Sequence, residues 1–150
     1  MEHYYVNIGS YKLKIPSKYK TDISLTNRDL NINEQILYTY WKIRIDKFYL
    51  SINLSSFHKL DGLKNNIKLI TKEDVDVDVD VDVNTITVND ISGVTYGNYE
   101  EPRTWIDWWF RKGDTTICIN LQSEKFPHTK PTKDDILLHQ TIINSLQYLG

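Results

Sequence analysis

An acidic repeat is the first feature of this sequence whose residue types and spacing suggest chemistry. Aspartate alternates with valine through the segment EDVDVDVDVDVN, at residues 73–84. The repeated acidic residues are Asp74, Asp76, Asp78, Asp80 and Asp82. Strict alternation predicts a strand whose valine face packs on a core and whose aspartate face is a ladder of like charges about 6.8 Å apart. Three interpretations remain open: a solvated strand face, an acidic patch that captures a basic partner, or a metal site.

The metal interpretation is the weakest of the three. Calcium loops gather their oxygen ligands around a sharp turn that contains glycine, and the acidic repeat has no glycine. A straight strand also spaces its carboxylates too widely to form a cage. The four histidines, residues 3, 58, 128 and 139, show no paired metal-ligand spacing. We therefore expect no metal site and no cofactor.

One carboxylate has surroundings that could support catalysis. Asp107 lies between Trp105 and Trp109, and a carboxylic acid between two indoles could act as a general acid on a carbohydrate. No second carboxylate is placed beside it by spacing, and the motifs of serine hydrolases and phosphate-binding loops are absent. Cys118 is predicted to lie within a strand, as an incidental thiol. We expect a protein that is not an enzyme, with a carbohydrate-active enzyme using Asp107 as an alternative.

The same region contains residue types that are enriched in protein interfaces. Tryptophan, tyrosine and arginine dominate interface hot spots, and several occur together in the segment TYGNYEEPRTWIDWW, residues 95–109. Trp108 falls on the face expected to join the core, whereas Trp105 and Trp109 fall on the opposite face. The predicted partner-binding residues are the five aspartates of the repeat together with Tyr99, Arg103, Trp105, Asp107 and Trp109.

Length and composition limit the kinds of partner. The chain has 150 residues and a formal net charge of −2, so we predict one domain over residues 1–150 without a basic field for nucleic acid or anionic membrane. No run of eighteen apolar residues predicts a membrane span, and the first residues do not resemble a signal peptide. A cytoplasmic location is therefore expected.

Hydrophobic alternation predicts several strands and two hairpins. The segment YKLKIP, residues 11–16, alternates apolar and basic residues as a half-buried strand does. The apolar positions change parity across Asp46 and Lys47, which predicts a hairpin turn there. A second hairpin is predicted over residues 105–121, with RKGD as its turn. Residues 18–30, in contrast, are polar and predict a loop that holds one short strand at most.

Helical spacing is found in two places. A short helix is predicted near residues 57–67, weakened by Gly62. At the end of the chain, Thr132 and Asp135 form a T-x-x-D capping signature, followed by an apolar stripe. The stripe contains Ile136, His139, Ile142, Ile143, Leu146 and Leu149. The predicted fold class is α+β: an antiparallel sheet with one short helix and a long C-terminal amphipathic helix packed on it.

The order of these segments resembles the PsbP-like and DcrB-like α+β folds. YKLKIPSKYK looks like their opening strand and proline-bearing loop, and the hairpin followed by IINSLQYL, residues 142–149, is similar to their closing part. The same layout occurs in immunity proteins that neutralise secreted toxins, including the lipase-immunity type of the type VI secretion system, and in chaperones for secreted effectors. The resemblance implies a non-catalytic bacterial binding protein and carries over no functional residue.

The expected function is that of an immunity protein that occludes a cognate toxin. The acidic repeat would attract a basic surface of that toxin, and the aromatic residues would anchor the contact. The alternative partner is a secreted effector, which a chaperone or adaptor would bind through an apolar segment. No nucleic acid and no membrane is expected among the partners.

Overall fold

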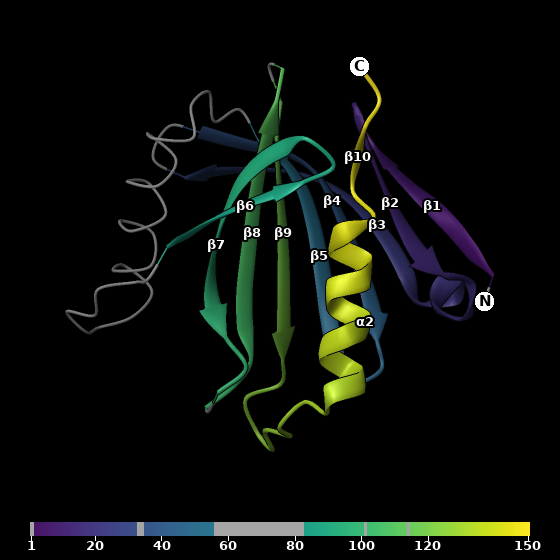
Figure 1. Ribbon diagram of the computed structural model, residues 1–150, viewed down its shortest axis with the longest axis vertical. Helices are drawn as coiled ribbons and strands as arrows, with labels where there is room; N and C mark the ends of the chain where they lie inside the picture. The colour runs from purple at the N-terminus through teal and green to yellow at the C-terminus, as the bar shows by residue number, and fades with distance from the viewer. Residues whose placement is uncertain (1, 33–34, 56–82, 101, 114) are drawn as a thin grey trace.

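Two antiparallel sheets and one α-helix form the part of the chain that the computed structural model describes (Figure 1). That part comprises residues 2–32, 35–55, 83–100, 102–113 and 115–150. The smaller sheet has the order β1-β2-β10, with β1 His3–Ile8, β2 Tyr11–Pro16 and β10 Gln147–Tyr148. Helix α2 spans Lys133–Asn144, and a 3-10 helix, η1, spans Ser17–Asp22.

The larger sheet has seven strands in the order β3-β4-β5-β9-β8-β7-β6. Their bounds are β3 Ile23–Ile32, β4 Gln35–Ile45, β5 Phe48–Ser55, β6 Asn84–Val88, β7 Ile91–Asn98, β8 Trp105–Lys112 and β9 Thr115–Ser123. Figure 1 shows α2 in front of this sheet, with the smaller sheet beside it. One apolar core joins all three, because β2, β5, β8, β9 and α2 each contribute fully buried side chains to it.

The turns explain why the hairpins form where the sequence predicts them. Asp46 adopts the left-handed conformation, with φ 57°, between β4 and β5, so the parity change there is a hairpin turn as predicted. Asn89 and Asp90 both have positive φ, 47° and 65°, and join β6 to β7 through a two-residue loop. Asparagine and aspartate tolerate this conformation, which matches the twist of the flanking strands. The hairpin of β8 and β9 is likewise confirmed.

The C-terminal helix corrects the predicted fold class. It has 12 residues rather than the predicted long amphipathic helix, and the fold is β-rich with two sheets rather than one sheet covered by helices. The capping box of Thr132 and Asp135 is present, as predicted. The helix ends at Ser145, whose hydroxyl accepts a hydrogen bond from the backbone N–H of Lys14 at 2.9 Å.

The residues after Ser145 explain why the helix is short. The chain extends as β10 and pairs with β2, which offers backbone groups that a longer helix would have left unpaired. Leu146 is fully buried beyond the end of the helix, so part of the apolar stripe belongs to this extended segment. Residues 18–30, predicted as a loop with one short strand at most, contain more strand than expected, because β3 occupies Ile23–Ile32. The helix predicted near residues 57–67 lies outside the described residues.

A tyrosine hydroxyl connects the two sheets. Tyr11 of β2 donates a hydrogen bond to the carbonyl of Thr115 at 2.7 Å and accepts one from the N–H of Lys112 at 2.9 Å. Both partners flank the turn between β8 and β9. The ring of Tyr11 is fully buried, so the apolar body and the satisfied hydroxyl both stabilise the contact between the sheets. Strand β8 therefore has a fixed position relative to the core.

Candidate functional site

The predicted partner-binding residues fall into three groups in the structure. Asp74, Asp76, Asp78, Asp80 and Asp82 lie outside the described residues. Trp105, Asp107 and Trp109 lie in β8, on its outer face, which points away from the shared core, and Arg103 lies two residues before the strand. Tyr99, from the loop after β7, packs instead against the core. The structure therefore does not bring together all the residues that the sequence grouped.

Asp107 is held by two hydrogen bonds on the outer face of β8. Its Oδ2 accepts a hydrogen bond from the indole N–H of Trp105 at 2.9 Å, and its Oδ1 accepts one from the side-chain amide of Asn120 at 2.7 Å. Asn120 faces Asp107 across the pairing of β8 and β9. Asp107 is 5% exposed, so a buried carboxylate orients Trp105. This arrangement is that of a positioning group rather than of a surface contact.

Arg103 and Trp105 form the part of this cluster that reaches solvent. The guanidinium of Arg103 lies over the indole ring of Trp105, 4.4 Å from its centroid. Both side chains are half-buried, and each therefore keeps some exposed surface. A cation over the face of tryptophan is favourable, and the planar guanidinium also stacks well. Because one face of the indole is covered by Arg103 and its N–H is bound to Asp107, the pair is ordered before any partner arrives.

Trp109 corrects the prediction of an outward aromatic pair. It is 5% exposed and lies across the pairing from Cys118, which is also buried. Burial, followed by the charge of Asp107, raises the pKa of the Cys118 thiol well above its usual range. A neutral, buried thiol is a poor nucleophile, which is consistent with the predicted incidental role. Neither Trp109 nor Asp107 presents the exposed surface that a contact anchor requires.

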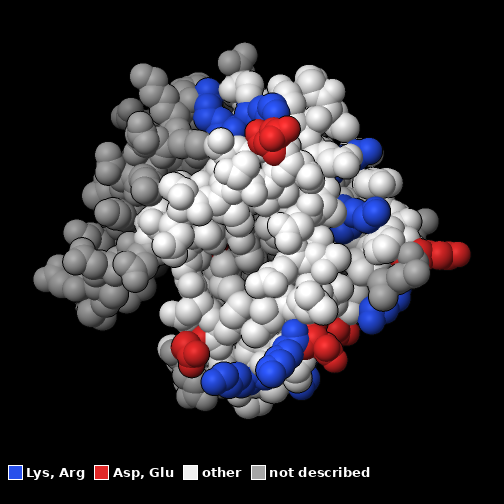
Figure 2. Space-filling model, in the orientation of Figure 1, with Lys and Arg blue, Asp and Glu red and all other residues white. Residues whose placement is uncertain are grey.

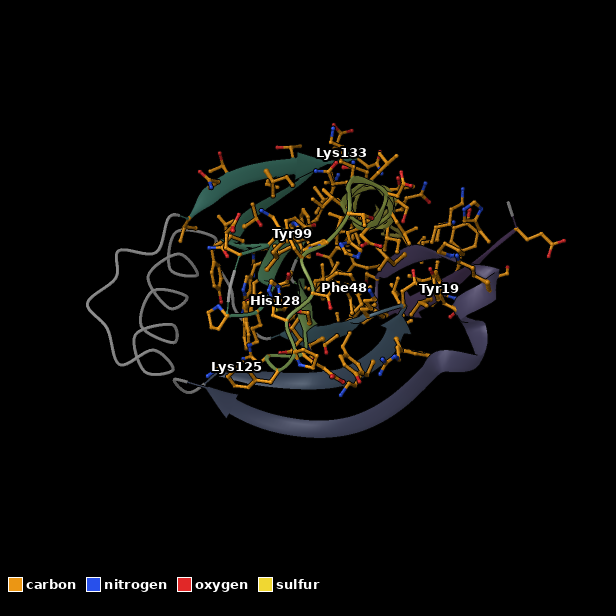
Figure 3. All side chains as sticks on the ribbon, turned by 90° about the horizontal axis from the view of Figure 1, so that it is seen from below. Tyr19, Phe48, Tyr99, Lys125, His128 and Lys133 are labelled. Atoms are coloured by element: carbon orange, nitrogen blue, oxygen red, sulfur yellow. The ribbon has the colours of Figure 1, made fainter. Side chains whose placement is uncertain are left out.

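Tyr99 belongs to a different cluster, which the sequence grouping missed. Its ring stacks on His139 of α2 with centroids 6.0 Å apart, and its hydroxyl oxygen lies 3.4 Å from Nδ1 of that histidine. Phe48 meets the same imidazole edge-on, with centroids 4.6 Å apart. Figure 3 shows Tyr99 and Phe48 near the middle of the molecule when it is seen from below. His139 is 3% exposed, so it lies in the core, as its place on the apolar stripe of the last helix predicts.

The electrostatics of this cluster keep both rings neutral. Burial lowers the pKa of His139 to about 4, although the charges of Asp135 and Asp46 act in the opposite direction. Burial and then the charge of Asp135 raise the pKa of Tyr99 to about 12. Near pH 7 the imidazole is therefore uncharged and functions as an aromatic core residue.

The sequence contains a signal for the hydrogen bond between Asn120 and Asp107, which was not among the predicted interactions. Counting outward from the RKGD turn pairs Lys112 with Thr115 and hence Asp107 with Asn120. An amide opposite a carboxylate on one sheet face predicts a hydrogen bond between them. No comparable signal joins Tyr99 to His139, because 40 residues separate them and only the packing of α2 brings them into contact.

Metal binding and membrane insertion have simple structural tests. Among the described residues, no group of three or more histidine, cysteine, aspartate or glutamate side chains is arranged to hold a metal ion. Within the same part of the chain, no helix is long and apolar enough to cross a membrane.

Comparison with known proteins reveals similarity of fold. No family model matches the sequence, and no curated protein is similar enough in sequence to match it. Among solved structures, the chain is similar to the solution structure of the cyanobacterial PsbP protein CyanoP from Synechocystis sp. PCC 6803. The TM-score is 0.62 at 9% sequence identity, covering 98% of this chain and 91% of that one. The resemblance to a PsbP-like fold is thus confirmed, and at this identity the likeness concerns the fold alone.

Proposed function

We propose that this chain is a non-catalytic protein-binding module that occludes a partner protein, as an immunity protein does with its cognate toxin. The observation that carries the proposal is the ordered pair of Arg103 and Trp105 at the start of β8. Tryptophan and arginine are the residue types that most often dominate binding energy at protein interfaces. The PsbP-like fold is compatible with this function and does not by itself assign it.

The side chains of Arg103 and Trp105 are already ordered, which lowers the entropy cost of binding a partner through them. A partner that contacts a mobile tryptophan must also offset the entropy lost when the side chain becomes fixed, about 0.5–1.5 kcal/mol for each immobilised side chain. The hydrogen bond from Trp105 to Asp107 and the stacked guanidinium of Arg103 have already restricted the indole. Asp107 therefore contributes to binding indirectly, as a positioning residue.

The acidic repeat indicates the charge that the surface of the partner protein should carry. Its five aspartates, residues 74–82, carry a dense negative charge in the sequence. Such a charge attracts a basic surface and raises the association rate at low salt. We propose that the toxin has such a surface and that electrostatic attraction precedes contact with Trp105.

The test is capture of the partner by the full chain and by two matched variants. The wild-type chain is used to recover proteins from the secreted fraction of the source organism, identified by mass spectrometry. Trp105→Ala should lower the affinity for the recovered toxin by at least tenfold. Tyr5→Ala is the matched control and should leave this affinity unchanged. Tyr5 also has a cation over its ring, with Lys12 4.4 Å from the centroid, but it lies on the smaller sheet, away from the proposed contact. Circular dichroism verifies that both variants fold, and Arg103→Ala is the milder second variant.

Salt dependence tests the electrostatic part separately. Neutralising Asp78 and Asp80 to asparagine should slow association and flatten its dependence on salt between about 50 and 500 mM, a threefold change in Debye length. Equal affinity of the Trp105 and Tyr5 variants would contradict the proposed contact. A salt-resistant partner recovered through an apolar segment would instead favour an effector chaperone.

A further inference from the structure

A pocket lies on the other side of β8 from the proposed partner surface. It has a volume of about 320 Å³, is lined by α2, β6, β8 and the loop after β7, and is open to solvent on one side, where Gln140 and Asn144 are exposed. Ile86, Ile106, Trp108 and Ile143 form its apolar walls. Figure 2 shows the face of the molecule that carries α2 and β6, and the surface is hollowed near the centre of this face.

The lining of the pocket excludes a charged ligand. Besides the four apolar walls, it contains Tyr99 and the two amides Gln140 and Asn144, so none of the lining side chains in the described part of the chain carries a charge near pH 7. The charged side chains visible in Figure 2 lie around the margin of this face and not at its centre. A charged ligand would lose its hydration without meeting an opposite charge, which is costly. A neutral ligand loses much less.

The volume and the walls indicate the shape of the ligand. A cavity of about 150 Å³ holds one benzene ring, so this pocket has roughly the room for two rings with a small substituent. Trp108 and Tyr99 provide flat aromatic surfaces, against which a planar ring system packs favourably. The apolar walls therefore fit a planar bicyclic body.

The two amides indicate which polar group the ligand carries. Gln140 and Asn144 are four residues apart on α2, so their side chains lie on the same face of the helix and line one side of the pocket. Each amide has both a donor and an acceptor. A neutral ligand edge that both donates and accepts, such as a carboxamide, is the complementary chemistry.

A clamp between α2 and β6 keeps the pocket formed without a ligand. The side-chain amide of Asn89 donates hydrogen bonds to the carbonyl of Asn144 at 3.1 Å and to that of Leu146 at 2.8 Å. It thereby ties the turn after β6 to the C-terminal end of the helix. Ligand pockets are usually preformed and mostly apolar, and three of the four apolar walls of this one, Ile106, Trp108 and Ile143, are buried.

We propose that this pocket binds a small neutral ligand with a planar ring system of up to two rings and a hydrogen-bonding amide-like edge. The ligand site is independent of the partner surface, because it faces the core side of β8. Trp108 and Tyr99 hold the rings, and Gln140 and Asn144 bind the polar edge.

The test uses two probes that differ in charge but hardly in shape: indole-3-carboxamide and indole-3-carboxylate. Each is titrated into the full chain, and binding is followed by NMR at the indole N–H of Trp108 and the side-chain amides of Gln140 and Asn144. The carboxamide should bind at least tenfold more tightly than the carboxylate, with shifts confined to the pocket. Equal binding of both probes or shifts elsewhere would overturn the proposal. So would no binding of the carboxamide at about 10 mM, a concentration that nearly saturates a site of only millimolar affinity.

Two variants then assign the binding to this pocket. Ile86→Trp fills the space and should weaken carboxamide binding at least tenfold. Thr85→Trp adds the same side chain at an exposed position of the same strand and should change binding less than twofold. Gln140→Leu, at the solvent-exposed rim of the pocket, removes one amide and serves if the first variant does not fold. Unchanged binding in Ile86→Trp or Gln140→Leu would contradict the assignment.

Discussion

The two faces of β8 are stabilised by different kinds of interaction. On the inner face, Ile106, Trp108 and Phe110 join the apolar core together with β9 and α2. On the outer face, Asp107 accepts hydrogen bonds from Trp105 and Asn120. The same eight-residue strand thus has a face that depends on packing and a face that depends on hydrogen bonding.

This difference determines how each face responds to substitution. Removing a buried apolar group costs its transfer free energy and leaves a cavity, so the loss depends on the volume removed. Removing one member of a buried hydrogen-bonded group leaves its partners unsatisfied, so the loss depends on how many partners remain. The inner face therefore tolerates a change of shape better than a loss of volume, whereas the outer face tolerates neither a lost donor nor a lost acceptor.

The largest expected effect is on the inner face. Phe110 is fully buried, so Phe110→Ala should lower the free energy of unfolding by about 3–5 kcal/mol. Urea denaturation measures this loss. Leu137→Ala, at a position 62% exposed on α2, is the control and should change stability by less than about 0.5 kcal/mol. A loss below about 1 kcal/mol for Phe110→Ala would show that this face is not the tightly packed one.

The corresponding change on the outer face is Asp107→Ala. It removes the acceptor of the Trp105 indole N–H and leaves the amide of Asn120 with its longer hydrogen bond to the carbonyl of Ile106, at 3.5 Å, so we expect a loss of about 2–3 kcal/mol. Asp107→Asn retains one acceptor oxygen and should lose less. Urea denaturation gives the stability, and the NMR signal of the Trp105 indole should shift in both variants. If the alanine variant were as stable as the wild type, hydrogen bonding would not be what stabilises this face.

A titratable group beside the inner face predicts a pH dependence. Burial lowers the pKa of His139 to about 4 from an unfolded value of about 6.5, so in this window the unfolded chain binds a proton that the folded chain does not. Stability should therefore fall as the pH falls from 6.5 to 4, by about 2 kcal/mol. The comparison is with His139→Phe, which removes the imidazole but keeps a ring between Phe48 and Tyr99. Identical pH profiles for the variant and the wild type would exclude His139 as the source.

The smallest expected effect concerns the helix that covers the inner face. Thr132→Ala removes the hydroxyl that accepts the backbone N–H of Asp135 at 3.1 Å. The loss should be about 1 kcal/mol. Thr129→Ala, an exposed threonine of the preceding loop, is the matched control. If thermal denaturation showed the same loss of stability for Thr132→Ala and Thr129→Ala, the cap would contribute little to the docking of α2.

The hairpins could be predicted because local rules decide them. Period-two alternation identified β8 and β9, and the parity change at Asp46 identified the turn between β4 and β5. The capping box of Thr132 is likewise a local interaction, made within one helical turn. The length of β3 was underestimated because its residues do not alternate clearly, and its partner β4 provides the pairing that its own side chains do not signal.

Only part of the candidate site could be predicted in the same way. Arg103 and Trp105 are near neighbours in the chain, so their association was within reach of the sequence. The pairing of Asp107 with Asn120 required the register of one hairpin. The pocket required α2, β6 and β8 to be in place together, and no pattern in a single segment specifies that arrangement.

The sequence by itself determined the hairpin of β8 and β9 and the turn between β4 and β5, since these follow from side-chain periodicity and turn chemistry. Tertiary structure decided where the helix ends, because β2 offered backbone partners that turned the last residues into β10. It also separated Tyr99 from Trp105, placing one against His139 and the other beside Asp107. The physical reason is that a side chain's direction is local, whereas the group that it meets depends on how distant elements pack.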